Sequence, residues 1–404
     1  MARAAAPTSS SSGPAYVATV SFVASRAVPF GGFFVALPGG MALARVAQLR
    51  GLRQGYGASL ATLIETVALM GPARFGVPFT QALSAPVLGR MEGRSAAPAW
   101  QLLVCLAIRL FQNGLGAVFF IFVIAGGLDA YAGSAENVAN LVGLNVGQAD
   151  TLLLTFAGIL AWSLFASTVQ VTVYRRGLSR WTTGDHPHAE EPEDLSAHRG
   201  RFDPRAVAVA AAIGFGLLLA STEWAVLGSV AAALAIAWAL SKPDNSTVPT
   251  GLALAAILSL GALTFALVGG LGIEVALRRA LRAALLVTVA TWLRAAAGAS
   301  GLREVGRRAL GRLQFIPGVP EAAATLDQIG SEGRLLAAGR SLVDRLADVP
   351  RRPAPFLDAV LTWVNREAGS FRPARPARVA RLRLGLVDAA LVLLAAAPAA
   401  ALFL

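Results

Sequence analysis

Residues 206–240 read AVAVAAAIGFGLLLASTEWAVLGSVAAALAIAWAL, and Glu223 is the one charged side chain in this run. A helix crosses the hydrocarbon core of a bilayer with about 20 apolar residues, so the run is too long for a single span. Ser221, Thr222 and Glu223 interrupt it near its middle. The sequence therefore predicts two short membrane helices joined by a tight turn.

Apolar runs recur along the whole chain. We expect further membrane-spanning helices at residues 16–37, 100–127, 151–174, 250–270, 280–297 and 383–404. Residues 56–90 divide into two shorter apolar halves on either side of the Gly71-Pro72-Ala73-Arg74 break, which predicts a broken hairpin or a re-entrant pair. The pattern as a whole predicts an all-α, polytopic helical membrane protein.

The composition supports this class and excludes several others. Of the 404 residues, 55% are hydrophobic and 14% are charged, whereas soluble domains carry about 25% charged residues. An intrinsically disordered chain needs low hydrophobicity, and a disulfide scaffold needs more than the single cysteine, Cys105. The net charge of +12 does not indicate nucleic-acid binding, because no basic patch is interleaved with aromatic residues.

The arginine positions predict the topology, because cytoplasmic loops of membrane proteins are enriched in positive charge. Arginines flank residues 181–201 on both sides, so this linker is expected in the cytoplasm. The loop 128–150 carries acidic residues and no Lys or Arg, so it is expected outside. The N-terminus is then also outside, and residues 1–15 are interpreted as a disordered tail.

The linker 181–201 is also the predicted domain boundary. It is acidic and holds all three histidines, His186, His188 and His198, and such a stretch cannot bury a core. A weak transition-metal site is one interpretation of the histidines, but we favour a solvated linker. The chain then divides into an N-terminal membrane domain, 16–180, and a C-terminal domain, 202–404.

Residues 300–382 differ from the rest, because they contain many arginines in helical periodicity and no membrane span. In 301–314 the apolar residues fall on one face and the arginines on the other, which is typical of an amphipathic helix. Two further helices are expected at 317–346 and 356–368, separated by prolines. We therefore expect a cytoplasmic layer of amphipathic coupling helices over about 301–368, before the last span.

Five stretches of the C-terminal half have a familiar pattern. They are Phe202-Asp203-Pro204-Arg205, Gly272-Ile273-Glu274-Val275-Ala276-Leu277 with Arg278 and Arg282, Gly301-Leu302-Arg303, Phe315-Ile316-Pro317 with Glu321, and Arg381-Leu382-Arg383. In these stretches, about residues 202–404 resemble the T component of energy-coupling factor (ECF) transporters, the transmembrane scaffold of a class of bacterial ABC importers.

The resemblance implies a multi-pass scaffold in the bacterial inner membrane. Such a scaffold couples two separate cytoplasmic ABC-type ATPases to a substrate-binding membrane (S-type) subunit, for vitamin or metal-ion uptake. It also implies that short arginine motifs dock the ATPases, and the matching positions are Arg334 or Arg340 for the first motif and Arg366 for the second. A guanidinium near a helix end can bind carboxylates in an acidic groove; the alternative is that these arginines face solvent or lipid headgroups.

No enzymatic motif accompanies this pattern. HExxH, CxxC, P-loop and nucleophile-elbow sequences are absent, so we expect no catalytic residue, metal, cofactor or ATP site in this chain. Glu65 and Arg109 lie inside apolar runs, where charged side chains are costly. We expect them to form a buried pair, and we favour a structural role for it over the lining of a substrate cavity.

Two questions stay open from the sequence. The N-terminal domain is interpreted either as a fused substrate-binding module or as an accessory domain, and we favour the second because no vitamin- or metal-binding signature is recognised. The alternative function is a non-transport scaffold that binds partners or anionic lipid through its basic cytoplasmic helices.

Overall fold

The computed structural model describes residues 11–28, 31–74, 77–141, 143, 147–181, 200–244, 247–329, 332–349, 353–371 and 384–402. These residues form helices and the turns between them, and no strand occurs among them. The helices are α1 (Ser12–Ala27), α2 (Gly32–Arg50), α3 (Leu52–Met70), η1 (Pro72–Arg74), α4 (Val77–Gly93), α5 (Pro98–Phe119), η2 (Phe120–Ile124), α6 (Leu128–Leu141), α7 (Gln148–Arg180), α8 (Pro204–Ala220), α9 (Trp224–Leu240), α10 (Val248–Val268), α11 (Ile273–Arg312), α12 (Val319–Leu326), α13 (Glu332–Ala347), α14 (Pro353–Ser370), α15 (Leu386–Ala396) and η3 (Ala397–Leu402).

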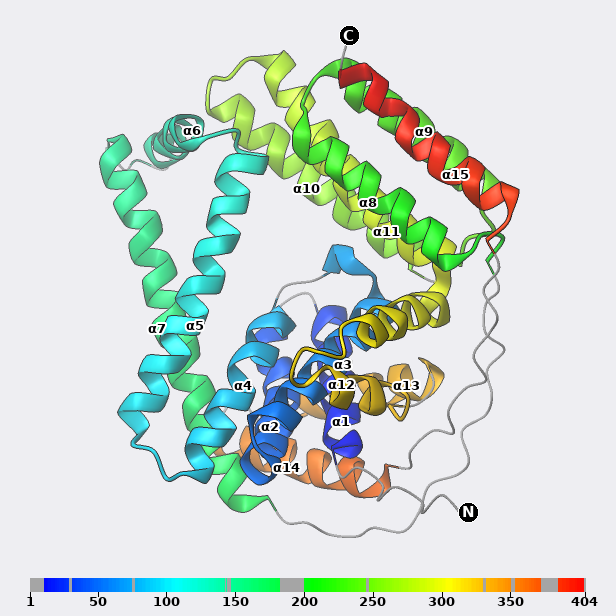
Figure 1. The fold of residues 1–404 in the computed structure, drawn as a ribbon. Coiled ribbons are helices and arrows are strands. Elements are labelled where there is room, and N and C mark those ends of the chain that lie inside the picture. The colour runs from blue at the N-terminus through cyan, green and yellow to red at the C-terminus, as the bar shows by residue number, and fades with distance from the viewer. Residues whose placement is uncertain are drawn as a thin grey trace.

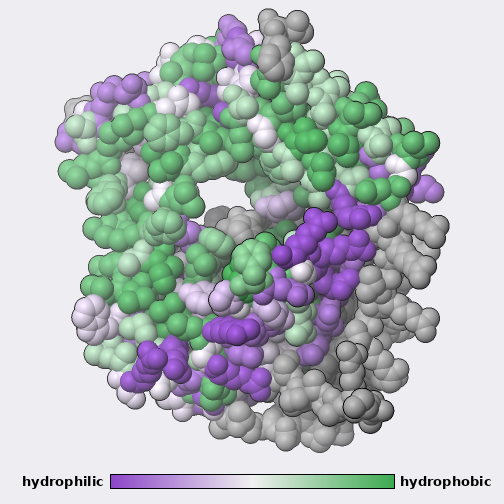
Figure 2. Space-filling model, viewed as in Figure 1, coloured by the Kyte–Doolittle hydropathy of each residue, from purple (hydrophilic) through white to green (hydrophobic). Residues whose placement is uncertain are grey.

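Five helices in the described residues are long and apolar enough to cross a membrane. They are α2, α5 with its π-helical extension η2, α7, α10 and α11. The helices α8, α9 and α15 with η3 are apolar but shorter. Hydrophobic residues cover most of the upper and left parts of the molecule, and hydrophilic residues gather towards its centre and lower part (Figure 2). The all-α prediction is confirmed, and the fold is consistent with a membrane protein.

Two predicted breaks inside apolar runs are confirmed. Helix α8 ends at Ala220 and α9 begins at Trp224, on either side of the Ser-Thr-Glu interruption. Helix α3 ends before Gly71, whose φ of 80° is a conformation that glycine adopts readily. The chain then passes through η1 into α4, so 56–90 is a broken pair of helices.

Several other predicted boundaries are wrong. Residues 16–37 are not one span, because α1 ends at Ala27 and α2 begins at Gly32, after Gly31 in the left-handed conformation (φ 79°). Part of the predicted N-terminal tail is helical, because α1 begins at Ser12.

Two predicted stretches lie outside the described residues. They are the linker, which falls mostly on residues 182–199 and holds the three histidines, and the basic stretch 372–383.

The amphipathic region agrees with the prediction in one part and differs from it in another. The expected span 280–297 and the expected helix 301–314 are confirmed as the two helical parts of α11, which Gly298 separates with non-helical backbone angles (φ 69°, ψ 164°). The helix expected at 317–346 is two helices, α12 and α13, and the loop expected at 128–150 contains α6.

Buried hydrophobic residues form two cores. The first, here called the mixed core, draws on α1–α4 and on α12–α14. The second, here called the apolar core, draws on α8, α9, α15 and the first part of α11. Figure 1 shows α8–α11 and α15 together at the top, α1–α4 and α12–α14 below them, and α5 and α7 along the left side. The cores therefore do not follow the two halves of the sequence.

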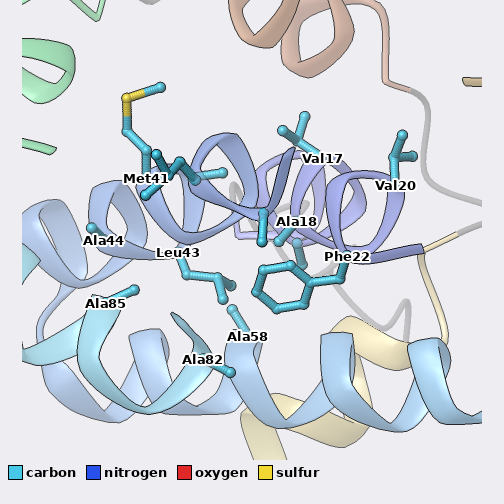
Figure 3. Close-up of a cluster of buried hydrophobic side chains, with 14 of the residues drawn as sticks. Val17, Ala18, Val20, Phe22, Met41, Leu43, Ala44, Ala58, Ala82 and Ala85 are labelled. Atoms are coloured by element: carbon cyan, nitrogen blue, oxygen red, sulfur yellow. The ribbon is translucent and has the colours of Figure 1, made fainter. Parts of the chain in front are cut away.

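Small side chains make the mixed core dense. Ala44 of α2, Ala58 of α3 and Ala82 and Ala85 of α4 lie between the helices, beside larger residues such as Phe22 (Figure 3). A Cβ added at Gly89 of α4 would collide with the main chain at Ala44. Small residues of this kind let helix backbones approach closely, which explains the close packing of α2 on α4.

Candidate functional site

Helix α11 passes from one core into the other. Its buried residues up to Ala297 contribute to the apolar core, and its partly buried Leu302 also packs against that core. Its buried residues Ala299 and Leu310 contribute to the mixed core. Gly298, between Ala297 and Ala299, has a φ of 69° that is disfavoured for side-chain-bearing residues. The kink therefore lies where α11 changes partners.

Arg294 stands four residues before the kink and is only 1% exposed. Its Nε donates to the carbonyl oxygen of Leu69 (2.9 Å), its Nη1 to Oδ2 of Asp244 (3.0 Å) and its Nη2 to Oε1 of Glu332 (2.9 Å). We call these four residues the Arg294 junction. It ties α11 to the end of α3, to the loop between α9 and α10, and to the start of α13. Buried guanidinium groups need such partners, because an unpaired buried charge is strongly unfavourable.

A second buried ion pair lies below the kink. Glu65 of α3 is 2% exposed, and its Oε2 accepts a hydrogen bond from Nε of Arg303 at 2.5 Å. A Cβ built on Gly306 of α11 would lie 2.5 Å from Ile64 of α3, so the two helices are in close contact at this point. The pair therefore joins α3 to the amphipathic part of α11.

Helix α3 also contacts α12. Arg53 and Glu321 form an ion pair of 2.6 Å at the surface, which contributes little by itself. A Cβ built on Gly57 would lie 2.6 Å from Cβ of Glu321 and 2.9 Å from the carbonyl oxygen of Gly318, so the backbones touch here. Along its length, α3 is thus fixed to α12 and to both sides of the α11 kink.

The predicted pair between Glu65 and Arg109 is not formed. Arg109 of α5 is 4% exposed, and its Nη2 donates to Oε1 of Gln170 in α7 at 2.6 Å. Its guanidinium also lies 5.3 Å from the ring centre of Phe33. The prediction placed two charges of opposite sign together, but Glu65 faces α11 and Arg109 faces α7. Sequence alone does not show which helices are neighbours.

A third buried arginine, Arg282 of α11, was missed as a site residue. Its Nε and Nη2 donate to the carbonyl oxygens of Leu218 (2.5 Å) and Leu219 (2.9 Å) at the end of α8. Its Nη1 donates to the carbonyl oxygen of Val123 in η2 (2.8 Å). Helix C-termini leave carbonyl groups without intrahelical donors. Arg282 satisfies these groups and joins the end of α5 to the apolar core.

The three predicted docking arginines have different surroundings. Arg340 and Arg366 are exposed, and Arg366 has Glu367 at 3.5 Å. Arg334 instead stacks on the rings of Tyr16 (5.1 Å) and Phe371 (5.7 Å), so it helps to hold α13 against α1. Burial raises the pKa of the Tyr16 phenol, and the Arg334 charge opposes this change.

The turn between α11 and α12 presents apolar side chains to the outside. Phe315 is 78% exposed, and Leu313 and Ile316 are exposed beside it. Arg312 is exposed at the end of α11, next to this turn. The sequence marked Phe315-Ile316-Pro317 only as a junction between helices. Exposed aromatic and aliphatic groups beside an arginine are typical of protein contacts, so the turn is a further candidate interaction element.

The last helix is attached to α8 through two carboxylates. Asp388 of α15 accepts hydrogen bonds from the main-chain N–H groups of Asp203 and Gly385, both at 2.8 Å. Asp203 caps α8 and accepts from the main-chain N–H (2.9 Å) and the guanidinium of Arg205. The hydrogen bonds from Arg205 hold the pKa of Asp203 below its ordinary value, against the opposing effect of burial.

The described residues contain no group of three or more His, Cys, Asp or Glu side chains placed to hold a metal ion. Comparison of the chain with protein-family models, curated proteins and solved structures finds no match. The roles of the candidate sites therefore rest on the geometry of this structure alone.

Proposed function

We propose that this protein is the transmembrane coupling subunit of an ECF-type ABC importer in the bacterial inner membrane. It would link two separate cytoplasmic ATPases to a substrate-binding membrane module for vitamin or metal-ion uptake. ATP hydrolysis would belong to the ATPases and not to this chain.

One observation carries the proposal, namely the path of α11 between the two cores. The amphipathic helices α12–α14 pack on α1–α3, and α11 connects them to the apolar core. The Arg294 junction binds α3, α11 and α13 at the kink. A force on α13 would be passed through Glu332 and Arg294 to the apolar part of α11. Rigid helices joined at a glycine hinge are suited to transmit such a movement.

The proposed ATPase contacts are Arg340, Arg366 and the turn at Phe315. The two arginines are exposed on α13 and α14, and each can bind a carboxylate in a partner's groove. Arg334 positions α13 on α1 in this account and does not contact the ATPase. The amphipathic layer would face the cytoplasm, in agreement with the arginine distribution.

A pull-down from native membranes in mild detergent, followed by mass spectrometry, tests the proposal. The tagged full-length protein is compared with an Arg340→Ala/Arg366→Ala double variant. The matched control is Arg94→Ala/Arg176→Ala, which removes two exposed arginines elsewhere. We expect ABC-type ATPases with the wild type and the control, and their loss with the docking variant.

The other outcomes of the pull-down would overturn parts of the proposal. ATPases retained by the docking variant would keep the function but overturn the two anchors. No ATPase with any variant, from cells that express such ATPases, would overturn the transporter assignment. Salt-sensitive binding to anionic vesicles in that case would favour the non-transport scaffold.

A further inference from the structure

Among the described residues three arginines are almost fully buried, and one of them, Arg109, has a buried guanidinium nitrogen without a hydrogen-bond partner. Arg294 binds two carboxylates and a carbonyl, and Arg282 binds three carbonyls. Arg109 has Gln170 as its hydrogen-bond acceptor, and its Nε is buried with no partner among the described residues. Arg282, like Arg109, has only neutral oxygen acceptors, so what distinguishes Arg109 is the buried guanidinium nitrogen that has no acceptor.

The surroundings of Arg109 are polar but uncharged. In the described part of the chain it forms no ion pair, and the ionisable groups that act on it are Cys105 and Tyr174. Both are neutral near pH 7 by their ordinary pKa values of about 8.5 and 10. Arginine cannot release its proton in a protein. The site therefore holds one positive charge for which the described residues supply no negative partner.

A second unpaired donor points to the same place. Gln81 of α4 is fully buried, and its Nε2 has no hydrogen-bond partner among the described residues. Its Oε1 accepts from Tyr174 at 2.5 Å. Gln170 and Tyr174 are one turn apart on α7, so Arg109 and Gln81 bind neighbouring positions of the same helix face. Two free donors thus lie between α4, α5 and α7.

We infer that Arg109 and Gln81 form a binding site for the carboxylate of a small monoanionic acid. A single guanidinium balances one negative charge, and its fork geometry matches the two oxygens of a carboxylate. We propose a small acid because the surroundings are densely packed: a Cβ added at Gly40 of α2 would collide with the Tyr174 hydroxyl. Gln170 is held in turn by Ser84 at 2.7 Å, which fixes the orientation of its oxygen towards Arg109.

This inference goes beyond the proposed function, which assigns substrate binding to a separate membrane module, because it places a site for a small acid in the N-terminal helices of this chain. Binding of the acid needs no ATPase, so the acid site and the transporter function can be overturned separately. If the wild-type protein recovers no ATPases but still responds to the acid, the transporter assignment alone is overturned.

The test is thermal unfolding of the purified full-length protein in detergent, with sodium acetate as the probe. Sodium chloride and sodium sulfate are compared at equal ionic strength, to separate a carboxylate effect from general salt effects. Arg109→Gln removes the charge of the site, and Arg176→Gln removes an exposed arginine of α7 as the matched control. We expect acetate to raise the unfolding midpoint of the wild type and of the control by a few degrees relative to chloride.

The Arg109→Gln variant should show no acetate response, and in chloride it should be at least as stable as the wild type, because the uncompensated charge is gone. If this variant does not fold, Gln81→Leu replaces it, and its apparent acetate affinity should fall about tenfold through the loss of one hydrogen bond. Equal responses of wild type and Arg109→Gln, equal effects of chloride and acetate, or no acetate response of the wild type would each overturn the site.

Discussion

The mixed core and the apolar core are both rich in alanine, but they use charged side chains differently. In the mixed core a carboxylate and a guanidinium pair with each other inside the protein, as Glu65 and Arg303 do. In the apolar core Arg282 and Asp388 bind main-chain atoms at helix ends. The ion pair of Asp203 with Arg205 joins close neighbours in sequence at the start of one helix. Arg294, at the boundary, does both, because it binds one carbonyl and two carboxylates.

The difference indicates how each core is assembled. Main-chain acceptors at helix ends fix where an apolar helix stops, which suits short helices such as α8. Side-chain ion pairs instead choose which helices become neighbours, and they can join residues far apart in sequence. The mixed core needs this selection, because its helices come from both ends of the chain.

The largest loss of stability is expected at the Arg294 junction, which lies between the two cores. Arg294→Leu would leave Asp244, Glu332 and the Leu69 carbonyl without their shared donor. Three hydrogen bonds are lost, two of them to carboxylates that stay partly exposed, and such bonds contribute about 1–3 kcal/mol each, so we expect a loss of about 3 kcal/mol. Unfolding of the detergent-solubilised protein by denaturant measures the change. Arg312→Leu, at an exposed position of the same helix, is the control, and an equal loss in both variants would contradict the role of the junction.

A smaller effect is expected inside the mixed core. A double-mutant cycle with Glu65→Gln and Arg303→Gln should give a coupling free energy of about 1–3 kcal/mol, because the two groups are in contact. The same cycle with Glu65→Gln and Arg109→Gln should give less than about 0.5 kcal/mol. Comparable coupling in both cycles would show that α3 does not face α11 as described.

A side chain at Gly298, the kink between the cores, should destabilise the protein by about 1–2 kcal/mol. Gly298→Ala forces a side chain into a φ of 69°, which is unfavourable for L-residues by roughly this amount. Gly261→Ala in α10 is the control, because a Cβ there meets open space. Thermal unfolding compares the two, and a stabilised Gly298→Ala variant would show that α11 is straight in the native protein.

The smallest effect is expected in the apolar core and depends on pH. The pKa of Asp203 is lowered in the folded state, so its contribution is complete above the unfolded value of about 3.9 and is lost as pH falls through the folded value. Asp203→Asn keeps a capping side chain but loses the charge pair with Arg205, so it should cost about 0.5–1 kcal/mol near pH 6. The gap to the wild type should narrow in acid, below about pH 4. If the difference in unfolding free energy between the wild type and Asp203→Asn instead grows in acid, the pKa of Asp203 is not lowered in the folded state.

Much of the helix pattern could be predicted from sequence, because hydropathy and turn residues are local. The break at Ser221-Thr222-Glu223 is polar and was visible. The break between α1 and α2 was missed, although Arg26 and Pro29 stand beside two glycines in this run. The break within α11 did agree with the sequence, because Gly298 lies between the predicted span 280–297 and the predicted helix 301–314.

The partners of the charged residues could not be predicted in the same way. Glu65 and Arg303 are 238 residues apart in sequence, and nothing local to α3 marks α11 as its neighbour. Arg334 has the position that an exposed anchor needs, but its partners Tyr16 and Phe371 come from α1 and the end of α14. The docking function of Arg340 and Arg366 stays a prediction.

The association of N-terminal and C-terminal helices in one core is the central claim, and a disulfide between α1 and α13 tests it most directly. A Cβ built on Gly339 lies 3.8 Å from Cβ of Ala24, which is within the range of natural disulfides. The measurement is mass spectrometry of the cross-linked peptides from native membranes, for Ala24→Cys/Gly339→Cys in a Cys105→Ala background. Ala24→Cys/Ser241→Cys, which places the second cysteine near the apolar core, is the control. We predict an efficient disulfide in the first pair and none in the second, whereas no cross-link in the first, or equal amounts in both, would contradict the mixed core.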